Sequence, residues 1–367
     1  MITRHEAYDL SKRNTFGMKV SCRLYVEVME PEDLLTLDFD SLPQPLFVMG
    51  GGSNLLFTGD FSGTVLHLCN KGITVLPGEM KDGRSGSAMT GAVIPGEPAS
   101  VIPGLTGNLL VRASAGVVFD DFCAWAAQEG LWGPENLSLI PGEVGASAVQ
   151  NIGAYGVEAK DIIDTVHAFD RTTRTFVDIP GSACGYGYRT SLFKTSWKGC
   201  YLITSVTFRL SITPQPKLDY GGVRKALGDR EPSPAIIRDT IIDIRRQKLP
   251  DPEEIGSAGS FFCNPVIERE HFERIVALAK EENGPEYEVP HYDVGERVKV
   301  PAAWMIDQCG FKGMRFGGAQ VYPKQPLVIV NATGSATPDE IIALERRVID
   351  TIREKYGIEL HPEVEHV

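Results

Sequence analysis

Two glycine-rich segments have residue types that suit the binding of an anionic ligand. The first, Gly50-Gly51-Gly52-Ser53-Asn54, directly follows the apolar run Pro45–Met49. Glycines let backbone N–H groups approach an anion closely, and the serine and asparagine add side-chain donors. The segment is neither a GxGxxG turn that opens a helix nor a GxxxxGK[ST] phosphate loop. Taken alone, it is equally consistent with a tight hairpin turn between two strands.

The second segment covers residues 141–156 and has the sequence PGEVGASAVQNIGAYG, in which small residues dominate and Glu143 is the one charged residue. It has too few large side chains to serve as ordinary core, so its use is to bring backbone against something flat or anionic. A glycine-rich surface loop is the alternative. The interleaved Val144, Val149 and Ile152 indicate a buried segment instead.

The elements that must position these segments divide the chain into a strand-rich half and a more helical part. Periodicity and turn residues predict strands over residues 23–28, 45–49, 64–68, 165–169, 175–179 and 201–210. Helices are expected over residues 119–128, 234–247, 269–282 and 338–356, the last begun by a Thr337–Glu340 capping box. The pattern predicts an α+β fold with a boundary near residues 220–232. Residues 72–110, rich in Gly, Ser and Pro, are expected to form an exposed excursion.

Composition excludes several classes of function. The 367 residues are 43% hydrophobic and 23% charged, which is enough to build a core in two or three domains. The net charge of −12 disfavours nucleic acid as a partner, although local cationic groups could still bind one phosphorylated small ligand. The seven cysteines form no CxxC pair and the seven histidines no HExxH motif, so neither a disulfide framework nor a metal site is expected.

Targeting signals are not apparent in the sequence. No stretch of about 18 uncharged apolar residues is present, so we expect no membrane insertion. The opening residues MITRHEAYDLSKRNTFG contain no apolar segment of the kind a secretory signal needs. We therefore expect a cytoplasmic protein.

Seven short blocks occur in a fixed order between about residue 11 and residue 364. They are NTFG (14–17), GGGSNLL (50–56), PGEVGASAVQNIGAYG (141–156), GYRTSLFK (187–194), KLPDP (248–252), AGSFFCNP (258–265) and HPEV (361–364). In sequence and in order, this set resembles the type I UDP-N-acetylenolpyruvoylglucosamine reductases. One glycine-rich loop would be weak support, but seven ordered blocks over nearly the whole chain are specific to the family.

The resemblance implies a fold and a reaction. The fold would comprise two FAD-binding α+β subdomains of the vanillyl-alcohol-oxidase or PCMH-like flavoprotein type, plus a C-terminal α+β substrate domain. The corresponding divisions are residues 1–66 joined by 358–367, residues 67–228 with the excursion 72–110, and residues 229–357. The implied enzyme is a monomer that uses NADPH and non-covalent FAD to reduce UDP-N-acetylglucosamine enolpyruvate to UDP-N-acetylmuramate, a precursor of peptidoglycan.

The resemblance also implies particular site residues. The family's catalytic arginine, serine proton donor and C-terminal acidic residue fall on Arg189, Ser260 and Glu363. The tyrosine on a mobile loop that marks type I members falls on Tyr220, in LDYGG. The FAD-binding positions would be Gly50, Gly51, Gly52, Ser53, Asn54, Pro141, Gly142, Gly145, Ala146, Ser147, Asn151, Gly153 and Tyr155. The substrate contacts would be Tyr188, Tyr220, Lys248, Asn264, Lys299 and Gln308.

The implied chemistry explains these residue types. Hydride addition to the enolpyruvyl group leaves carbanion character beside a carboxylate, which a fixed guanidinium such as that of Arg189 would stabilise. Ser260 would then supply the proton at carbon, and Glu363 would orient or polarise the substrate together with Arg189. Without the resemblance, these residues would be read as a salt-bridge arginine, a turn or cap serine and a solvated glutamate.

Three departures from the family pattern are visible. Cys263 stands where many relatives carry a basic residue, Tyr322 stands where histidine is frequent, and the excursion is longer than expected. None removes a catalytic position, so an active enzyme is expected. One alternative is a flavoprotein that oxidises a sugar or alcohol, but the glycine-rich loops lack the His or Cys that often tethers flavin in such enzymes. A binding protein without activity is the other, and it would lack one of the three catalytic positions.

Overall fold

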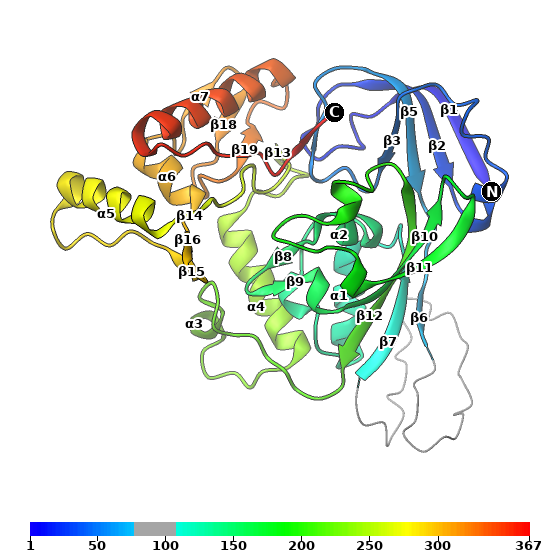
Figure 1. Cartoon of the computed structure of the whole chain (residues 1–367), viewed down its shortest axis with the longest axis horizontal. Coiled ribbons are helices and arrows are strands. Elements are labelled where there is room, and N and C mark those ends of the chain that lie inside the picture. The colour runs from blue at the N-terminus through cyan, green and yellow to red at the C-terminus, as the bar shows by residue number, and fades with distance from the viewer. Residues whose placement is uncertain (77–107) are drawn as a thin grey trace. The chain divides into compact units, whose positions relative to one another are not determined.

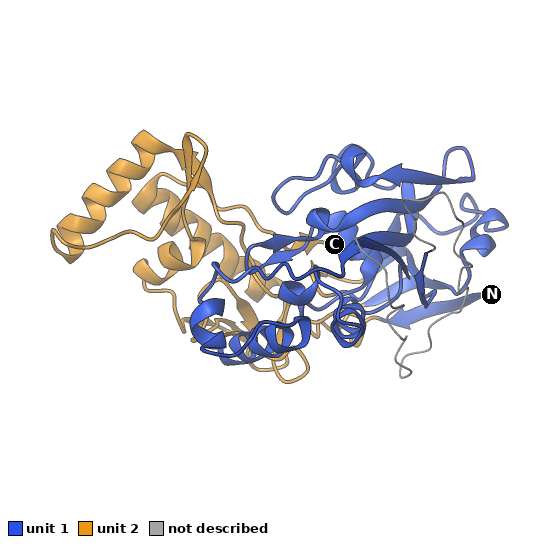
Figure 2. Cartoon of the chain, turned by 90° about the horizontal axis from the view of Figure 1, so that it is seen from below, with its two compact units in different colours: residues 1–9, 21–52, 61–247 blue, residues 10–20, 53–60, 248–367 orange. Residues whose placement is uncertain are grey.

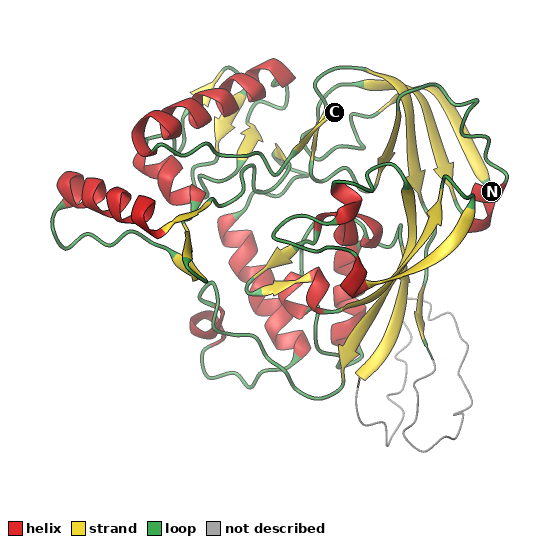
Figure 3. Cartoon of the chain, in the orientation of Figure 1, coloured by secondary structure: helices red, strands yellow, loops and turns green. Residues whose placement is uncertain are grey.

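The structure is a computed structural model that describes residues 1–76 and 108–367 (Figure 1). It contains helices and strands in both halves of the chain, which confirms the predicted α+β class (Figure 3). Residues 77–107, most of the expected excursion, lie outside the described residues. On either side of them, β6 (Ile73–Val75) and β7 (Asn108–Ser114) pair as antiparallel strands.

The described chain forms two compact units, coloured separately in Figure 2. The first unit contains residues 1–9, 21–52 and 61–247, and the second contains residues 10–20, 53–60 and 248–367. The final crossing between units follows residue 247. The break that the sequence suggested at residues 220–232 is a loop with the short helix α3 (Val223–Leu227) inside the first unit.

The first unit contains a four-stranded sheet whose two faces differ in chemistry. Its order is β1 (Ile2–Asp9), β2 (Ser21–Val28), β5 (Phe61–Leu68) and β3 (Leu46–Met49), with β1 antiparallel to β2 and β5 parallel to both neighbours. Because side chains alternate along a strand, Leu24, Val26 and Leu66 all join one apolar core. The Tyr25 and His67 side chains lie on the opposite face of the sheet and are also buried.

A second sheet of the first unit is antiparallel, with the order β11 (Thr175–Pro180), β10 (Ile163–Asp170), β12 (Tyr201–Ser211), β7 and β6. One side packs against α1 (Phe119–Gln128) and α2 (Val144–Gln150), whose apolar residues share its core. Phe169 and Leu202 join the core under the first sheet instead. The sheet is therefore covered on both faces, and the bounds of α1 confirm the helix predicted there.

Helix α4 (Pro234–Lys248) closes the first unit along the chain. Ile237, Ile241 and Ile244 place its apolar stripe in a small core, and its bounds agree with the helix predicted over residues 234–247. Arg238 forms two hydrogen bonds to Asp120 of α1, at 2.5 and 2.9 Å. Burial opposes ionisation of Asp120, but hydrogen bonds from Arg238 and Leu139 and the Arg238 charge lower its pKa. The ion pair therefore ties α4 to α1.

The second unit is built from three small sheets and three helices. The sheets are β13 (Gly256–Ser257), β19 (Ile329–Asn331), β18 (Ala319–Val321) and β17 (Arg315–Phe316); β14 (Val266–Glu268), β16 (Arg297–Lys299) and β15 (Tyr292–Val294); and the parallel pair β20 (Glu365–His366) with β4 (Leu55–Leu56). The helices are α5 (Arg269–Asn283), α6 (Ala302–Gln308) and α7 (Pro338–Tyr356).

The caps of α7 follow the sequence prediction. The Thr337 side chain accepts a hydrogen bond from the Glu340 amide, and the Glu340 side chain accepts one from the Thr337 amide. Gly357 ends the helix in the left-handed conformation, with φ of 65°. The predicted capping box is confirmed. Across the residues that the structure describes, we find no helix with the length and hydropathy required to cross a membrane.

The contact between β3 and β5 leaves no room for a side chain at Gly63. A Cβ there would lie 1.9 Å from the Pro45 carbonyl oxygen, which is immobile backbone. We expect Gly63→Ala to lower the free energy of unfolding by about 1–3 kcal/mol, the usual cost of overpacking. Urea denaturation followed by circular dichroism measures this loss. Gly59→Ala is the matched control, since a Cβ at Gly59 would meet nothing within 4 Å. Equal stability of the two variants would contradict the prediction.

Candidate active site

The two glycine-rich segments touch each other in the first unit. A Cβ at Gly50 would lie 3.3 Å from the Ala146 Cβ, and a Cβ at Gly51 would lie 3.4 Å from the Gly142 Cα. Gly52 has φ of +66°, a conformation that favours glycine. Two stretches about ninety residues apart in sequence are thus packed backbone to backbone, so neither is an isolated hairpin turn.

Part of the second segment is the helix α2, which sequence reasoning did not predict. Its first amides donate to loop carbonyls, Val144 to Val117 and Gly145 to Ala115, both at 2.9 Å. A Cβ at Gly145 would lie 3.0 Å from the Ala115 Cβ. The buried Ser147 hydroxyl donates to the Val144 carbonyl at 2.6 Å. Gly145 and Ser147 therefore help to seat the helix, and their contact with FAD stays a prediction.

These segments fit a dinucleotide cofactor such as FAD. A diphosphate is bound best where backbone donors approach it without intervening Cβ atoms. Gly50, Gly51 and Gly142 supply such backbone: a Cβ at Gly50 would crowd Ala146, Gly51 lies within contact distance of Gly142, and Gly142 itself has φ of +117°, which favours glycine. We call Gly50–Gly52 together with Gly142 and Ala146 the glycine cradle.

The hairpin β8 (Gly153–Ala154) and β9 (Val157–Glu158) follows the cradle and fixes Arg189. The Arg189 Nη2 donates to the Gly153 carbonyl at 2.5 Å, and the guanidinium lies 5.2 Å from the centre of the Tyr188 ring. A Cβ at Gly153 would come within 2.7 Å of the Arg189 Nη1. Arg189 itself has φ of 56°, which is uncommon for a residue other than glycine. The structure thus holds this guanidinium in one place.

Asn151 links the cradle helix to the turn that carries Arg189. Its side-chain amide donates to the Gly187 carbonyl at 2.7 Å and to Glu158 Oε2 at 3.2 Å. Its side-chain oxygen accepts from the Lys160 amide at 3.0 Å. Asn151 is fully buried, so its side chain acts as a structural tie between these segments.

Tyr220 lies beside the tip of the same hairpin. A Cβ at Gly156 would be 3.2 Å from the Tyr220 Cβ, and a Cβ at Gly221 would be 2.7 Å from the Tyr155 ring. Tyr220 remains 37% exposed. The structure therefore brings Tyr155, Tyr188, Arg189 and Tyr220 to one hairpin of the first unit.

Arg245 of α4 is a residue that sequence reasoning missed. Burial lowers its pKa, and Tyr155 and Asp120 act in the opposite direction. Its Nε is buried and makes no hydrogen bond among the described residues. The available signal was spacing, because Arg245 lies four residues after Ile241 and shares the buried side of the helix. A buried guanidinium with spare hydrogen-bonding capacity near Tyr155 suits an anionic or carbonyl ligand.

In the second unit, Ser260 and Glu363 lie on neighbouring segments. The Glu363 amide donates to the Phe261 carbonyl at 2.8 Å, and the Cys263 amide donates to the His361 carbonyl at 2.9 Å. The Asn54 side chain donates to the Glu363 carbonyl at 3.1 Å. Ser260 is half-buried next to the fully buried Phe261. The structure thus brings together Ser260, Glu363 and Asn54.

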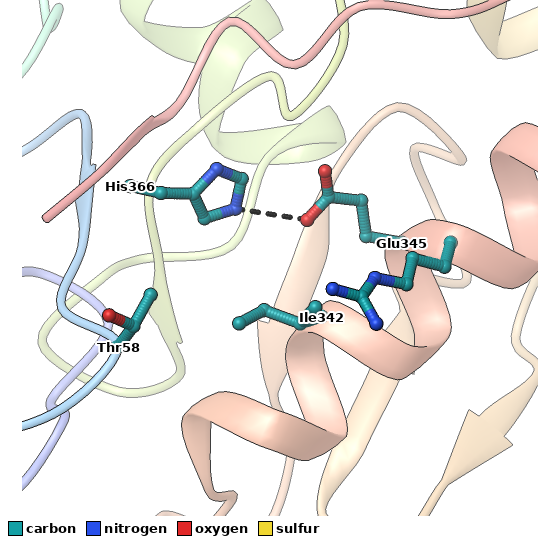
Figure 4. Close-up of a pocket in the computed structure, with 5 residues that line it drawn as sticks. Thr58, Ile342, Glu345 and His366 are labelled. Atoms are coloured by element: carbon teal, nitrogen blue, oxygen red, sulfur yellow. Dashed lines mark ion pairs between the residues drawn. The ribbon is translucent and has the colours of Figure 1, made fainter.

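The segment that carries Glu363 is fixed a second time, at a shallow pocket of the second unit. Nε2 of His366 in β20 lies 2.9 Å from Oε2 of Glu345 in α7, as Figure 4 shows. Thr58, Ile342 and Arg346 complete the lining of this pocket. Its lining includes none of the predicted site residues, so we assign it to holding the C-terminal strand.

Besides Tyr188 and Tyr220, four substrate contacts were predicted. They lie at the end of α4, before β14, on β16 and at the end of α6. Oδ1 of Asn264 accepts from the Ala302 amide at 2.9 Å and so satisfies the start of α6. Lys299 lies on β16, where it pairs with Val266, the residue two positions after Asn264. The Lys299 Nζ lies 5.7 Å from the centre of the Tyr292 ring. Gln308 ends α6, about 10 Å from its start at 1.5 Å per residue. Lys248 is the exposed last residue of α4. Asn264 and Lys299 are brought together, and Gln308 is not adjacent to Asn264.

A cluster of polar groups beneath the cradle was also missed. Glu27, His67 and Cys69 place donor atoms within 4.8 Å of one another, although the sequence predicted no metal site. Protein partners already engage two of these side chains. The His67 Nδ1 lies 2.9 Å from the Tyr25 hydroxyl, and the His5 Nε2 lies 3.3 Å from Glu27 Oε2. His67 lies near the end of β5, and Cys69 follows the strand two residues later. A spacing of two residues forms no recognised motif by itself.

Comparison with known proteins agrees with this geometry. Residues 251–367 match the family description "UDP-N-acetylenolpyruvoylglucosamine reductase, C-terminal domain", and residues 88–175 match "FAD binding domain". A solved structure of the UDP-N-acetylenolpyruvylglucosamine reductase from Thermus caldophilus superimposes with a TM-score of 0.62 at 22% identity, covering 100% of this chain and 98% of that one. At that identity the likeness establishes the fold.

Sequence relatives extend the likeness to the family. The chain is 42% identical to the UDP-N-acetylenolpyruvoylglucosamine reductase of Bacteroides fragilis, over 99% of both proteins. It is likewise 42% identical to the reductase of the same name from Porphyromonas gingivalis, over 98% of both. Identity at this level over the whole length, together with the match of the C-terminal domain, shows that the chain belongs to the UDP-N-acetylenolpyruvoylglucosamine reductase family.

Proposed function

We propose that this chain reduces UDP-N-acetylglucosamine enolpyruvate to UDP-N-acetylmuramate with NADPH, using non-covalent FAD, as a step of peptidoglycan precursor synthesis. Family membership supplies the reaction. The observation that carries it to these residues is the glycine cradle, in which Gly50 and Gly51 pack on Gly142 and Ala146. Arg189 is held in the same unit by its hydrogen bond to the Gly153 carbonyl, which belongs to the hairpin that follows the cradle.

FAD, when bound, relays a hydride between the nicotinamide and the substrate. The chain contributes the surface that holds the cofactor and excludes side chains from it. In this proposal the cradle backbone binds the diphosphate, with Ser53, Asn54 and Pro141 at its margins. Asn151 and Gly153 then set the distance from the cradle to Arg189.

Arg189 is proposed to stabilise the charge that develops on the substrate. Hydride addition leaves carbanion character next to the substrate carboxylate, where a planar guanidinium donates two parallel hydrogen bonds. The bond to the Gly153 carbonyl and the contact with Tyr188 hold the guanidinium before substrate arrives. Such preorganisation is what makes electrostatic stabilisation effective, because little rearrangement is needed during the reaction.

Ser260 is proposed to deliver the proton to the substrate carbon, with Glu363 orienting the substrate. A serine hydroxyl is a weak acid, but a carbon with enolate character is a strong base, so the transfer is feasible. The hydrogen bond between the Glu363 amide and the Phe261 carbonyl holds these two segments together. Proton donor and orienting carboxylate would then act as one rigid group.

The remaining contacts are proposed for the substrate. Lys248, Asn264, Lys299 and Gln308 are proposed to bind its uridine and diphosphate, and Tyr188 is proposed as a further substrate contact. We also propose a division of the chain into three parts. Residues 1–66 with 358–367 and residues 67–228 would bind FAD, and residues 229–357 would form the substrate domain. We further propose that the enzyme acts as a monomer in the cytoplasm, where a nucleotide-sugar precursor would be made.

Anaerobic mixing tests the proposed function as a whole. Purified protein should be yellow and should release unmodified FAD on heating. Addition of NADPH should bleach the flavin absorbance, and subsequent addition of the enolpyruvyl UDP-sugar should restore it. Protein that cannot be reconstituted with FAD, or flavin that stays reduced in the presence of this substrate, would refute the proposal.

Replacement of Ser260 should separate the two half-reactions. In Ser260→Ala, flavin reduction by NADPH should keep nearly its full rate, because no proton is delivered to carbon in that half. Reoxidation by substrate should slow by about 10²–10⁴-fold, the usual loss when a positioned acid is removed. Stopped-flow absorbance at matched FAD occupancy measures both rates. Ser260→Cys, which retains a proton, should recover part of the lost rate. Equal slowing of both halves would indicate a structural serine instead.

Replacement of Tyr220 should affect the substrate and not the flavin. Its loop lies against the hairpin that fixes Arg189, so closure over bound substrate would exclude water there. Tyr220→Ala should raise the KM for the UDP-sugar roughly tenfold, the effect of losing one aromatic contact, with unchanged FAD content. Phe316→Ala is a matched control, because Phe316 is 41% exposed compared with 37% for Tyr220. An unchanged KM in Tyr220→Ala would disprove the assigned role.

A further inference from the structure

A row of polar side chains crosses the second face of the four-stranded sheet in the first unit. The strand register places His5 opposite Tyr25, and Glu27 opposite His67. The row runs from His5, whose side chain is 39% exposed, to His67, whose side chain is 7% exposed. Charged groups on a buried sheet face are costly unless they are paired, so a row like this one calls for an explanation.

The buried end of this row is an ion pair. The His67 Nε2 lies 2.9 and 3.1 Å from the two carboxylate oxygens of Glu143, whose side chain is 9% exposed. On its other side, the His67 Nδ1 lies 2.9 Å from the Tyr25 hydroxyl and 3.2 Å from the Cys69 sulfur. Burial alone would lower the pKa of His67, but hydrogen bonds to Cys69 and Glu143, and their charges, raise it to about 9.

Glu143 lies beside the cradle, where a negative charge is least expected. It is the N-cap residue of α2, yet its side chain makes no capping hydrogen bond and turns to His67 instead. A Cβ at Gly50 would lie 3.3 Å from Glu143 Oε2, so the carboxylate lies directly beside the cradle backbone. An uncompensated carboxylate beside backbone that is proposed to bind a diphosphate would repel that diphosphate.

We propose that His67 is the counter-cation of Glu143 and thereby a positioning residue for cofactor binding: it cancels the carboxylate charge beside the glycine cradle and holds that carboxylate in one place. This inference rests on the proposed binding of FAD in the cradle. Histidine suits the task because its two ring nitrogens join Glu143 on one side to Tyr25 and Cys69 on the other.

The proposal predicts a specific pattern of FAD affinities. His67→Gln keeps a polar side chain but leaves Glu143 negative, so the FAD dissociation constant should rise roughly 10- to 100-fold. Glu143→Gln removes the repulsion, so it should bind FAD within about threefold of the unsubstituted protein. The double variant should also return to within about threefold, because both charges are absent. Fluorescence titration of the FAD-free protein measures all three.

A purely structural role for the pair would give a different pattern. Each single variant would weaken FAD binding along with the thermal midpoint, and the double variant would be at least as weak as either. That result would overturn the proposal. His5→Gln is the matched control, since His5 belongs to the same polar row but pairs with Glu27 and not with Glu143. It should leave the FAD dissociation constant unchanged.

The pH dependence of FAD affinity gives a second readout. Because the pKa of His67 is raised to about 9, its ring stays positively charged above the ordinary histidine range. The charge is lost only as the pH rises through about 9. FAD affinity should therefore be constant near pH 7 and should fall above about pH 9. The facing groups Tyr25, Cys69 and Glu27 are retained in His67→Gln, which should be weak at all pH values without that fall. The same fall in His67→Gln would assign it to another group and overturn the proposal.

Metal analysis and the parent protein complete the test. If the parent protein contains one equivalent of zinc and His67→Gln contains none, this histidine is a metal ligand through its Nδ1. That result would overturn the proposal. If the parent protein binds no FAD at all, the proposed function itself fails. If it binds FAD and the charge-dependent pattern is missing, only the role of His67 fails.

Discussion

Close contact between two stretches of backbone is the constraint on which the rest of the first unit depends. Gly50 and Gly51 lie against Ala146 and Gly142, and a Cβ at Gly50 would come within a tight 3.3 Å of the Ala146 Cβ. That contact determines where β3 ends, where α2 begins, and hence where the hairpin β8–β9 presents its carbonyl to Arg189. Small residues here act as spacers of fixed size between elements that larger side chains would separate.

The same architecture uses side chains mainly to hold other residues. The side-chain amides of Asn54, Asn151 and Asn264 each form a hydrogen bond with a backbone group that is distant in sequence, and Asn151 also donates to Glu158 Oε2. Buried amides with satisfied hydrogen bonds specify one arrangement of the chain, because any other arrangement would leave them unpaired. Arg189, which is proposed to meet the substrate, is thereby held in place although it lies on a short turn.

Local signals explain what could be predicted from the sequence. The bounds of α1 and α7 followed from apolar spacing and from caps, which are properties of a few consecutive residues. The cradle segments were recognised by their glycine content alone. Their mutual contact was not predicted, because it joins positions far apart in the chain. Helix α2 was missed because its residues, VGASAVQ, are too small to show an amphipathic pattern. The pairing of His67 with Glu143 spans 76 residues and leaves no local signal.

The second unit is interrupted in sequence, and this has a consequence for the order in which the chain can fold. Asn331 donates to the Phe16 carbonyl, and the Ser257 amide donates to the Thr15 carbonyl, so residues 10–20 complete a unit whose bulk begins at residue 248. During synthesis, these early segments emerge long before their partners exist, while every residue of the first unit has been made by residue 247. The first unit can therefore assemble on the ribosome, whereas residues 10–20 and 53–60 must wait as loops. Contacts of such long sequence separation form slowly, so completion of the second unit is expected to set the pace at which a newly made chain becomes competent.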